Sequence, residues 1–467
     1  MSYRYCVAPF VHSVPYFTSR IKPNNMSNLS EKQQSLQAAD AATGGCEARL
    51  GTDAALSDRQ AILDKLTKER EHVLDRWADA DTLGLSQIEK EINSFQREHL
   101  KFMFGEKGVN PPINARNPVS VTMHNPRFSA ALWAVNTEAY RRKGTISRSQ
   151  KEVVALGISL SNNCPHCAFM HTAMGGAAGS DVPFDSIQRF YQTRDPDIAF
   201  PLSEGTDSLN HRLASWSIRH RDVGARDLIP CSSEQVPEVL GTVMLFGILN
   251  RVVDTFVSKS EGGPMFPSPV RALMKFESNS PMVQRMMSSM MSWGMHEEDA
   301  KVQAGQVLRE INKVAPIIKG YEGCTDEPPS ELPQELTWAA ESETIGTSFA
   351  FLAAEAEAMS TAFVPDAIRN YMKSWVSTWD GGKAPPGDRA EWLDPLVEAS
   401  GKTLDLKDKG VVGMLKLMLV VVVSSDKTDD NLVSECQETH GIRGSHAAVM
   451  WVAFLAAQRL CQLAIAA

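Results

Sequence analysis

Two long stretches of helical periodicity, separated by proline-rich breaks, constrain the fold of this chain more than any other feature. The first helical block runs from about residue 124 to residue 256, and the second follows the break 324-CTDEPPSELP-333 and reaches the C-terminus. Between them, residues 258–283 contain glycines and prolines that interrupt helices. Alternating apolar and polar residues, the pattern of strands, do not recur along the chain. The sequence therefore predicts an all-α protein.

The same breaks divide the 467 residues into five expected regions. Helical spacing of apolar residues begins only after residue 56, and the polar stretch before it is aperiodic. The regions are a disordered tail at 1–55, an N-terminal helical extension at 56–123, a first helical domain at 124–256, a linker and helical crossover at 257–330, and a second helical domain at 331–467.

The charge and hydropathy of the chain limit its partners. Its net charge is −9 and its pI is about 5.7, whereas nucleic-acid-binding chains usually carry a basic stripe, so we expect no nucleic-acid partner. The longest apolar run, 411–423, is shorter than the ~20 residues that span a bilayer and contains Lys416. It predicts a buried helix or strand, and we expect no membrane span.

The first 30 residues bear on localisation. They contain Arg4, Arg20 and Lys22 and no acidic residue, a pattern shared by organelle transit peptides and disordered tails. We therefore expect a cytoplasmic protein, or a mitochondrial or other organellar one if this segment directs import.

Eight cysteines in a chain of this length do not make a disulfide scaffold. Six are scattered, as expected of small apolar residues in a reducing compartment: Cys6, Cys46, Cys231, Cys324, Cys436 and Cys461. The remaining two, Cys164 and Cys167, lie together in 161-SNNCPHCAFMH-171 with His166 and His171. This cluster needs its own explanation.

The residues before the cluster predict how it is presented. Ser147 followed by Gln150 is a capping box, which should start a helix that runs through residue 160. Residues 161–163 should end this helix and cap the next one, whose first turn accommodates Pro165.

On this second helix, Cys164, Cys167 and His171 are spaced i, i+3 and i+7 and share one face. Helix N-terminal N–H groups favour a thiolate, and His171 can accept the proton of Cys167. Cys164 can close a disulfide once the first sulfur is oxidised. Glu152, on the preceding helix, can fold onto His171 and fix its tautomer. The pattern predicts a nucleophile, a base and an orienting carboxylate.

Two other interpretations compete with this one. Cysteine and histidine are zinc ligands, but structural zinc sites normally draw ligand pairs from two segments, and the sequence has no second Cys/His cluster. His166 also points away from the face of the other three residues. The second alternative is that both cysteines are inert and buried.

The motif Glu-x11-Cys-x-His-Cys-x3-His, at Glu152, Cys164, His166, Cys167 and His171, resembles that of the AhpD-like alkylhydroperoxidases. These belong to the carboxymuconolactone decarboxylase superfamily. The segments 124–163 and 249-LNRVVD-254 resemble the same family.

The resemblance implies an AhpD-like helical bundle, a CxxC hydroperoxide reductase with a histidine–glutamate proton relay, and oligomerisation. It also implies reduction by a dithiol carrier, such as a lipoylated protein or thioredoxin. No bound cofactor is expected beyond a redox-active Cys164–Cys167 disulfide. Cys167 would attack the peroxide because His171 is nearest to it, and Cys164 would resolve the sulfenic acid, although these roles can be exchanged. His166 would either shape the entrance or be a solvent-exposed polar residue. The decarboxylases proper lack the cysteine pair, so we do not expect decarboxylation.

The chain also contains a faint internal repeat. Residues 167–187 can be laid on 349–368, and residues 248–254 on 456–462, which implies two pseudo-repeated units. In the second unit, glycine, serine, phenylalanine and alanine stand where the first has its reactive side chains: Gly346, Ser348, Phe349 and Ala353. We therefore expect one working site and one structural copy.

Two fused units with a degenerate second one resemble sestrins in outline. This supports an alternative function, a redox-sensing regulatory or scaffold protein with little turnover. A methionine stripe between Met282 and Met295 fits either core packing or a partner-binding face.

The cysteine spacing makes a first prediction. Peroxide treatment should remove two protons from the peptide that contains Cys164 and Cys167, because a reversible disulfide forms between them. Mass spectrometry of digested protein measures this loss. The assignment is wrong if the pair stays reduced while Cys231 or Cys436 is oxidised.

Overall fold

The structure is a computed structural model that describes residues 122, 125–201, 208–221, 229–256, 304–305, 307–309 and 331–465. The described residues form helices and turns and contain no strand, so the predicted all-α class is confirmed. The expected tail, the N-terminal extension, nearly all of the linker and the methionine stripe lie outside the described residues.

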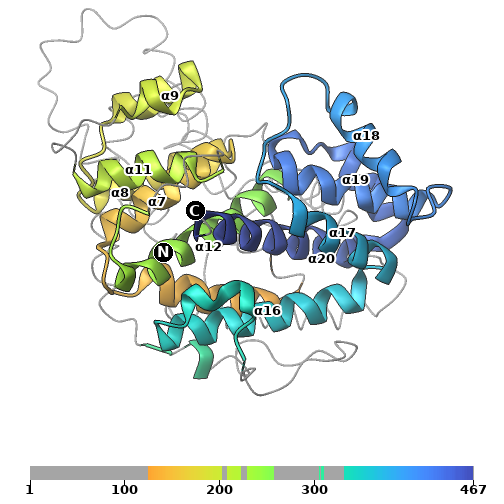
Figure 1. Cartoon of the computed structure of the whole chain (residues 1–467), viewed down its shortest axis with the longest axis horizontal. Helices are drawn as coiled ribbons and strands as arrows, with labels where there is room; N and C mark the ends of the chain where they lie inside the picture. The colour runs from red at the N-terminus through yellow and green to blue at the C-terminus, as the bar shows by residue number, and fades with distance from the viewer. Residues whose placement is uncertain are drawn as a thin grey trace, which may run out of the picture. The chain divides into compact units, whose positions relative to one another are not determined.

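The helices of the first block are coloured from orange to green in Figure 1. They are α6 (Pro126–Val135), the π-helix η4 (Asn136–Arg141), α7 (Arg148–Ser161), α8 (Pro165–Ala177), α9 (Phe184–Thr193), α10 (Pro196–Ala199), α11 (Leu209–Arg219), η5 (Ser233–Gln235) and α12 (Val236–Phe256). Helix α7 packs against α8, α11 and α12 and is the hub of this block.

The second block consists of η7 (Gln334–Ala339), α16 (Glu343–Phe363), α17 (Asp366–Thr378), α18 (Arg389–Ser400), α19 (Lys409–Ser424), η8 (Ser425–Lys427) and α20 (Asp430–Ile465). Helix α19 contains the apolar run 411–423, which is buried apart from its first two valines and Lys416. Helix α20 is two helices joined at Gly441, whose φ of 62° is in the left-handed region that favours glycine.

The two blocks share one core. Helix α12 of the first block packs along α20 of the second (Figure 1). At their contact, a Cβ added to Gly247 would lie 3.0 Å from the Cβ of Ala457, so small residues permit the close approach. Helix α16 packs on α6, where the fully buried Arg127 guanidinium donates to Glu355 at 2.9 Å. The helices of the second block therefore pack directly against those of the first.

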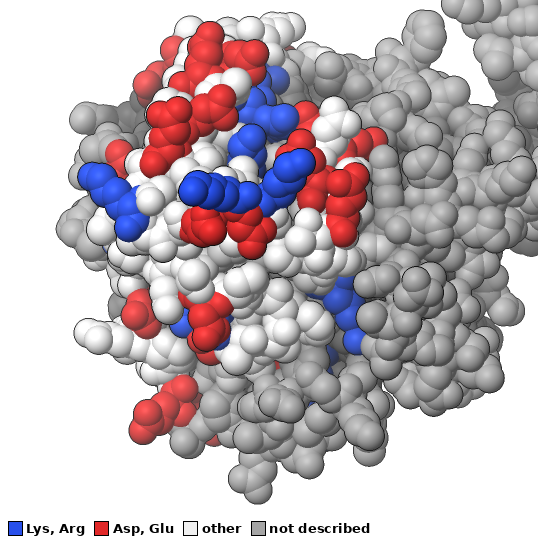
Figure 2. Space-filling model, turned by 90° about the vertical axis from the view of Figure 1, so that its right-hand side faces the viewer, with Lys and Arg blue, Asp and Glu red and all other residues white. Residues whose placement is uncertain are grey.

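Among the described residues, two helices are long and apolar enough to be compared with membrane spans: 233–256 and 430–465. Within their apolar windows, 89% and 72% of the residues are buried inside the protein. Both pack into the shared core, as the central helices of a globular domain do. Figure 2 shows acidic and basic side chains interspersed over part of one described face.

The repeat predicted from the sequence has a partial counterpart in the helix order. Helices α8 and α9 flank residues 178–183, and helices α16 and α17 flank Val364 and Pro365. However, α16 has 21 residues and α8 has 13. The existence of two equivalent units stays a prediction.

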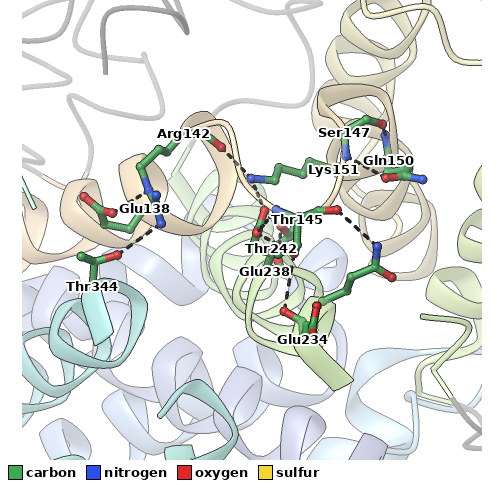
Figure 3. A network of polar contacts seen from close by, with 11 residues as sticks. Glu138, Arg142, Thr145, Ser147, Gln150, Lys151, Glu234, Glu238, Thr242 and Thr344 are labelled. Carbon is green, nitrogen blue, oxygen red and sulfur yellow. Dashed lines mark hydrogen bonds and ion pairs between the residues drawn. The ribbon is translucent and has the colours of Figure 1, made fainter. Parts of the chain in front are cut away.

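A partly buried polar network fixes the start of α7 against α12 (Figure 3). The predicted capping box is present, with Gln150 N–H donating to Ser147 Oγ and Ser147 N–H donating to Gln150 Oε1. Next to it, the buried Lys151 ammonium contacts Glu238 Oε2 at 2.5 Å and donates to the carbonyl of Arg142 at 2.8 Å. The other Glu238 oxygen accepts from Thr145.

In this network, burial and charge pairing shift the pKa values of the buried groups in opposite directions. Burial by itself would raise the pKa of Glu238, but the Lys151 ammonium and the donors on Thr145 hold it below its ordinary value. Burial lowers the pKa of Lys151 although Glu238 opposes the shift. The pair is therefore a buried ion pair, and removing one partner leaves the other charge without compensation.

This pair yields a stability prediction. Glu238→Gln should lower the free energy of unfolding by about 3 kcal/mol, within the range for breaking a buried ion pair. The exposed Glu234→Gln, on the adjoining turn, is the matched control and should be near neutral. Urea denaturation measures both.

The contribution of Glu238 to the free energy of unfolding should depend on pH. A carboxylate with a lowered folded pKa stabilises above its unfolded pKa, and this contribution is lost as pH falls through the folded pKa. The stability difference between wild type and Glu238→Gln should therefore shrink below about pH 4.5, the ordinary value for this carboxyl. A constant difference would show that the charge of Glu238 does not matter.

Candidate active site

The two cysteines lie at a sharp turn between α7 and α8, which we call the redox turn (residues 162–164). Asn162 is the C-cap of α7, Asn163 has a left-handed φ of 59°, and Cys164 is the N-cap of α8. The Cys164 N–H donates to the carbonyl of Ser159 at 2.9 Å. The expectation that residues 161–163 cap α8 is wrong, because Asn163 turns away into the left-handed conformation and α8 begins without a side-chain cap.

The redox turn brings the two thiols together in the interior. The Sγ atoms of Cys164 and Cys167 are 2.8 Å apart, and the residues are 1% and 7% exposed. Burial raises the pKa of Cys164 well above its ordinary value, and its contact with Cys167 and the negative charge of Asp254 act in the same direction. For Cys164, burial outweighs the helix N-terminus expected to favour a thiolate. Cys164 is therefore a protonated thiol at neutral pH.

The structure places Glu152 against His171, one turn after Cys167 on α8. Glu152 Oε2 lies 2.8 Å from His171 Nδ1 in the interior, where both residues are nearly inaccessible. An ionised carboxylate can only accept a hydrogen bond, so Nδ1 carries the proton and donates. In the neutral imidazole this leaves the other nitrogen, Nε2, as a proton acceptor. The contact thus fixes the tautomer required of a base.

Arg148 keeps this carboxylate ionised. Its Nε and Nη2 both contact Glu152 Oε1 at 2.7 Å. Burial alone would raise the pKa of Glu152, but Arg148, followed by His171 and Tyr140, lowers it below its ordinary value. The sequence analysis missed Arg148. The i, i+4 spacing of a basic and an acidic residue on α7 is the signal that identifies it.

Aromatic rings enclose the histidine. The Phe246 ring, from α12, meets His171 edge-on with a centroid distance of 4.2 Å, and Tyr140 packs edge-on to Phe246 at 4.8 Å. The Tyr140 hydroxyl lies 3.4 Å from His171 Nδ1, and the Arg148 guanidinium lies 4.3 Å from the centre of the Tyr140 ring. Phe246 has no local sequence signal, because it lies on α12, far from the motif along the chain.

The fifth motif residue, His166, lies at the start of α8 and is partly exposed. Partial burial of its ring, followed by the charge of the nearby His171, lowers its pKa to about 4, so it is neutral at physiological pH. It is close enough to feel the charge of His171, but it makes no hydrogen bond among the described residues. Its role at the entrance stays a prediction.

Tyr191, on α9, also belongs to this neighbourhood and was missed in the sequence. Burial raises the pKa of its hydroxyl, and the charges of Cys164 and Cys167 add to the shift while Arg194 opposes it. The Arg194 guanidinium lies 5.5 Å from the centre of the Tyr191 ring. The phenol therefore stays protonated beside the thiols.

The described part of the chain also bears on the zinc interpretation, which stays an alternative. No group of three or more histidine, cysteine, aspartate or glutamate side chains there is arranged to hold a metal ion. In the motif itself, His171 Nδ1 and both oxygens of Glu152 already have protein partners.

Comparison with known families bears on this site. The model of the "Carboxymuconolactone decarboxylase family" matches residues 126–181, which include all five motif residues. The chain is also 22% identical, over 345 residues, to an alkyl hydroperoxide reductase of Mycobacterium tuberculosis (strain ATCC 25618 / H37Rv). That alignment covers 73% of this chain and 84% of the relative, so the similarity extends well beyond the family segment.

The relay makes a prediction for Glu152. In a Cys164→Ser background, Glu152→Gln should slow alkylation of Cys167. The neutral amide does not stabilise the protonated imidazole of His171 and does not fix the tautomer of the neutral ring. The loss should be near the lower end of the ~10²–10⁴ that general acid–base catalysis provides. The pH profile of alkylation measures it.

The lowered pKa of Glu152 determines how the difference in alkylation rate changes with pH. The advantage of wild-type Glu152 over glutamine should persist above that pKa and disappear as the pH falls through it. Identical profiles in the two proteins would make Glu152 a structural residue and end the relay at His171.

Proposed function

We propose that this chain is a thiol-dependent hydroperoxide reductase that uses Cys164 and Cys167 with the His171–Glu152 relay. The observation that carries the proposal is the pair of sulfurs 2.8 Å apart at the start of the helix that also bears the carboxylate-bound His171. The similarity to a mycobacterial alkyl hydroperoxide reductase supports it, and so does the family match around the motif.

In the first step, Cys167 attacks a hydroperoxide. His171 Nε2 takes the thiol proton, and the thiolate sulfur attacks the terminal oxygen of ROOH. The O–O bond breaks, and the alkoxide leaves as an alcohol by taking a proton from the imidazolium. Cys167 is oxidised to a sulfenic acid while the peroxide is reduced. Arg148 and Glu152 support this step by holding the imidazole in one tautomer.

In the second step, Cys164 attacks the sulfenic sulfur. A disulfide forms, and water leaves with the proton of the Cys164 thiol and the hydroxyl of the sulfenic acid. The raised pKa of Cys164 supports its assignment as the resolving cysteine, because a protonated thiol is the poorer attacking group in the first step. An external dithiol then reduces the disulfide by two exchange reactions and is itself oxidised.

The reductant and the assembly belong to the proposal. A dithiol carrier, either a lipoylated protein or thioredoxin, restores the thiols, and the protein assembles as a homo-oligomer. No further cofactor takes part.

A second function, redox sensing with little turnover, is favoured by one observation. Both thiols are buried, and burial raises the pKa of Cys164, which slows thiol–disulfide exchange with a protein partner. Such a protein would oxidise once and signal through its helical surface. Turnover number separates the two functions.

Peroxide consumption tests the proposal. Purified protein should consume an organic hydroperoxide over many turnovers with dihydrolipoamide, and thioredoxin with its reductase is the comparison. Cys167→Ser and Cys164→Ser should each abolish turnover. Cys231→Ser, a partly exposed cysteine outside the motif, should leave it unchanged.

Two free, buried cysteines of the second block, Cys436 and Cys461, provide a further control for the CxxC pair, because they do not form such a motif. A folded Cys436→Ser, Cys461→Ser double variant should keep full activity. One oxidation per chain with either reductant, and none thereafter, would favour the sensor.

A further inference from the structure

Four consecutive residues of the second helical block lie against the redox turn. Val423 and Ser424 end α19, and Ser425 and Asp426 begin η8. We call residues 423–426 the supporting turn. It lies more than 250 residues after the cysteines in the sequence, yet three of its four residues contact groups in or beside the redox turn.

The first contact reaches the residue before Cys164. Asn163 Nδ2 donates to Asp426 Oδ2 at 2.7 Å, while Asn163 Oδ1 accepts from Arg194 Nη1 at 2.8 Å. The amide of Asn163 is thus bonded at both ends. Ser424 Oγ donates to the other Asp426 oxygen at 2.6 Å and orients the carboxylate.

The backbone explains why such anchoring matters. Asn163 and Arg194 are the two non-glycine residues with positive φ in the described part of the chain, at 59° and 58°. They are also bonded to each other. Asparagine adopts this left-handed conformation more readily than most residues with a side chain, but it is still less favourable than helical or extended backbone, and the surrounding contacts stabilise it. The bridge of Arg194, Asn163 and Asp426 joins α9, the redox turn and the second block.

Two further contacts reach the same place. Ser425 Oγ donates to Asp254 at 2.8 Å, and Asp254 is the carboxylate whose negative charge acts on Cys164. Arg221 donates to the Val423 carbonyl at 2.9 Å and to Asn162 Oδ1 at 3.3 Å. Asn162 and Asn163 are therefore both tied to the supporting turn.

From this convergence, we propose that the supporting turn of the second block is a working part of the redox site, with Asp426 as a positioning residue for the Cys164–Cys167 pair. By holding Asn163 in its left-handed conformation, it keeps the Cys164 sulfur in contact with the Cys167 sulfur, at 2.8 Å, and thereby favours the disulfide. This deepens the proposed function and rests on it for its biological meaning. It also gives the second block a task that the expectation of a merely structural copy did not include.

The test is the equilibrium between the dithiol and the disulfide in dithiothreitol buffers. The two cysteine thiols lose two electrons and two protons to oxidised dithiothreitol, which becomes the reduced form. Asp426→Ala should lower the equilibrium constant for disulfide formation about three- to tenfold. This is less than the full effect of a charged hydrogen bond, because Asn163 is exposed and Asp426 is partly exposed. Asp426→Asn, which keeps the shape, should have a smaller effect in the same direction.

Two variants of Asn163 separate the bridge from the backbone. Asn163→Gly loses the bridge but adopts positive φ freely, whereas Asn163→Ala loses the bridge and is strained there. Both should favour the dithiol, and alanine should do so more. Glu398→Gln, an exposed acidic residue of the second block, is the matched control and should leave the constant unchanged. Thermal melting confirms that each variant is folded.

The equilibrium constants of the variants decide whether the supporting turn acts on the cysteine pair. Constants in Asp426→Ala and Asn163→Gly equal to that of Glu398→Gln would overturn the inference. The measurement uses no peroxide, so it is separate from the proposed activity. A redox equilibrium that responds to Asp426 in a protein that consumes no peroxide would leave this inference standing and overturn only the peroxidase.

Discussion

The arrangement of the candidate site depends on a single buried carboxylate. Glu152 is inaccessible to water, and a carboxylate in such a place is stable only if its charge is matched and its oxygens accept hydrogen bonds. Arg148 donates a hydrogen bond to one Glu152 oxygen, and His171 donates one to the other. The contact with Arg148 forms within α7, because the two residues are one turn apart, whereas the contact with His171 depends on how α7 packs against α8. The capping box and the Lys151–Glu238 pair hold the beginning of α7, so the structural network and the site are parts of one arrangement.

The sequence predicted those features that depend on neighbours along the chain. The all-α class follows from periodicity, and the start of α7 follows from Ser147 and Gln150, whose reciprocal hydrogen bonds are present. The placement of Glu152 on the helix before the cysteines also depends only on local spacing. Arg148 was recoverable on the same basis, because its partner is four residues away.

Features that depend on distant parts of the chain were not predicted. The start of α8 at Pro165 was predicted, but its cap was wrongly assigned to residues 161–163. Asn163 is instead held by Arg194 and Asp426, and no local pattern reveals partners that far apart. The enclosure of His171 by Phe246 likewise depends on how α12 packs. The reactivity of Cys164 was judged from its helix position, but its burial dominates, and burial is a property of the whole fold.

The burial of the two sulfurs has a kinetic consequence. A hydroperoxide is small and can reach an enclosed thiol through brief fluctuations of side chains, whereas a protein-borne dithiol must approach with its own bulk. In the proposed cycle, oxidation would therefore be the faster half-reaction, and reduction would wait for local opening of the chain around residues 162–167. Under steady supply of peroxide, the protein would accumulate in its disulfide form. Its throughput would then be governed by the frequency with which this short segment opens.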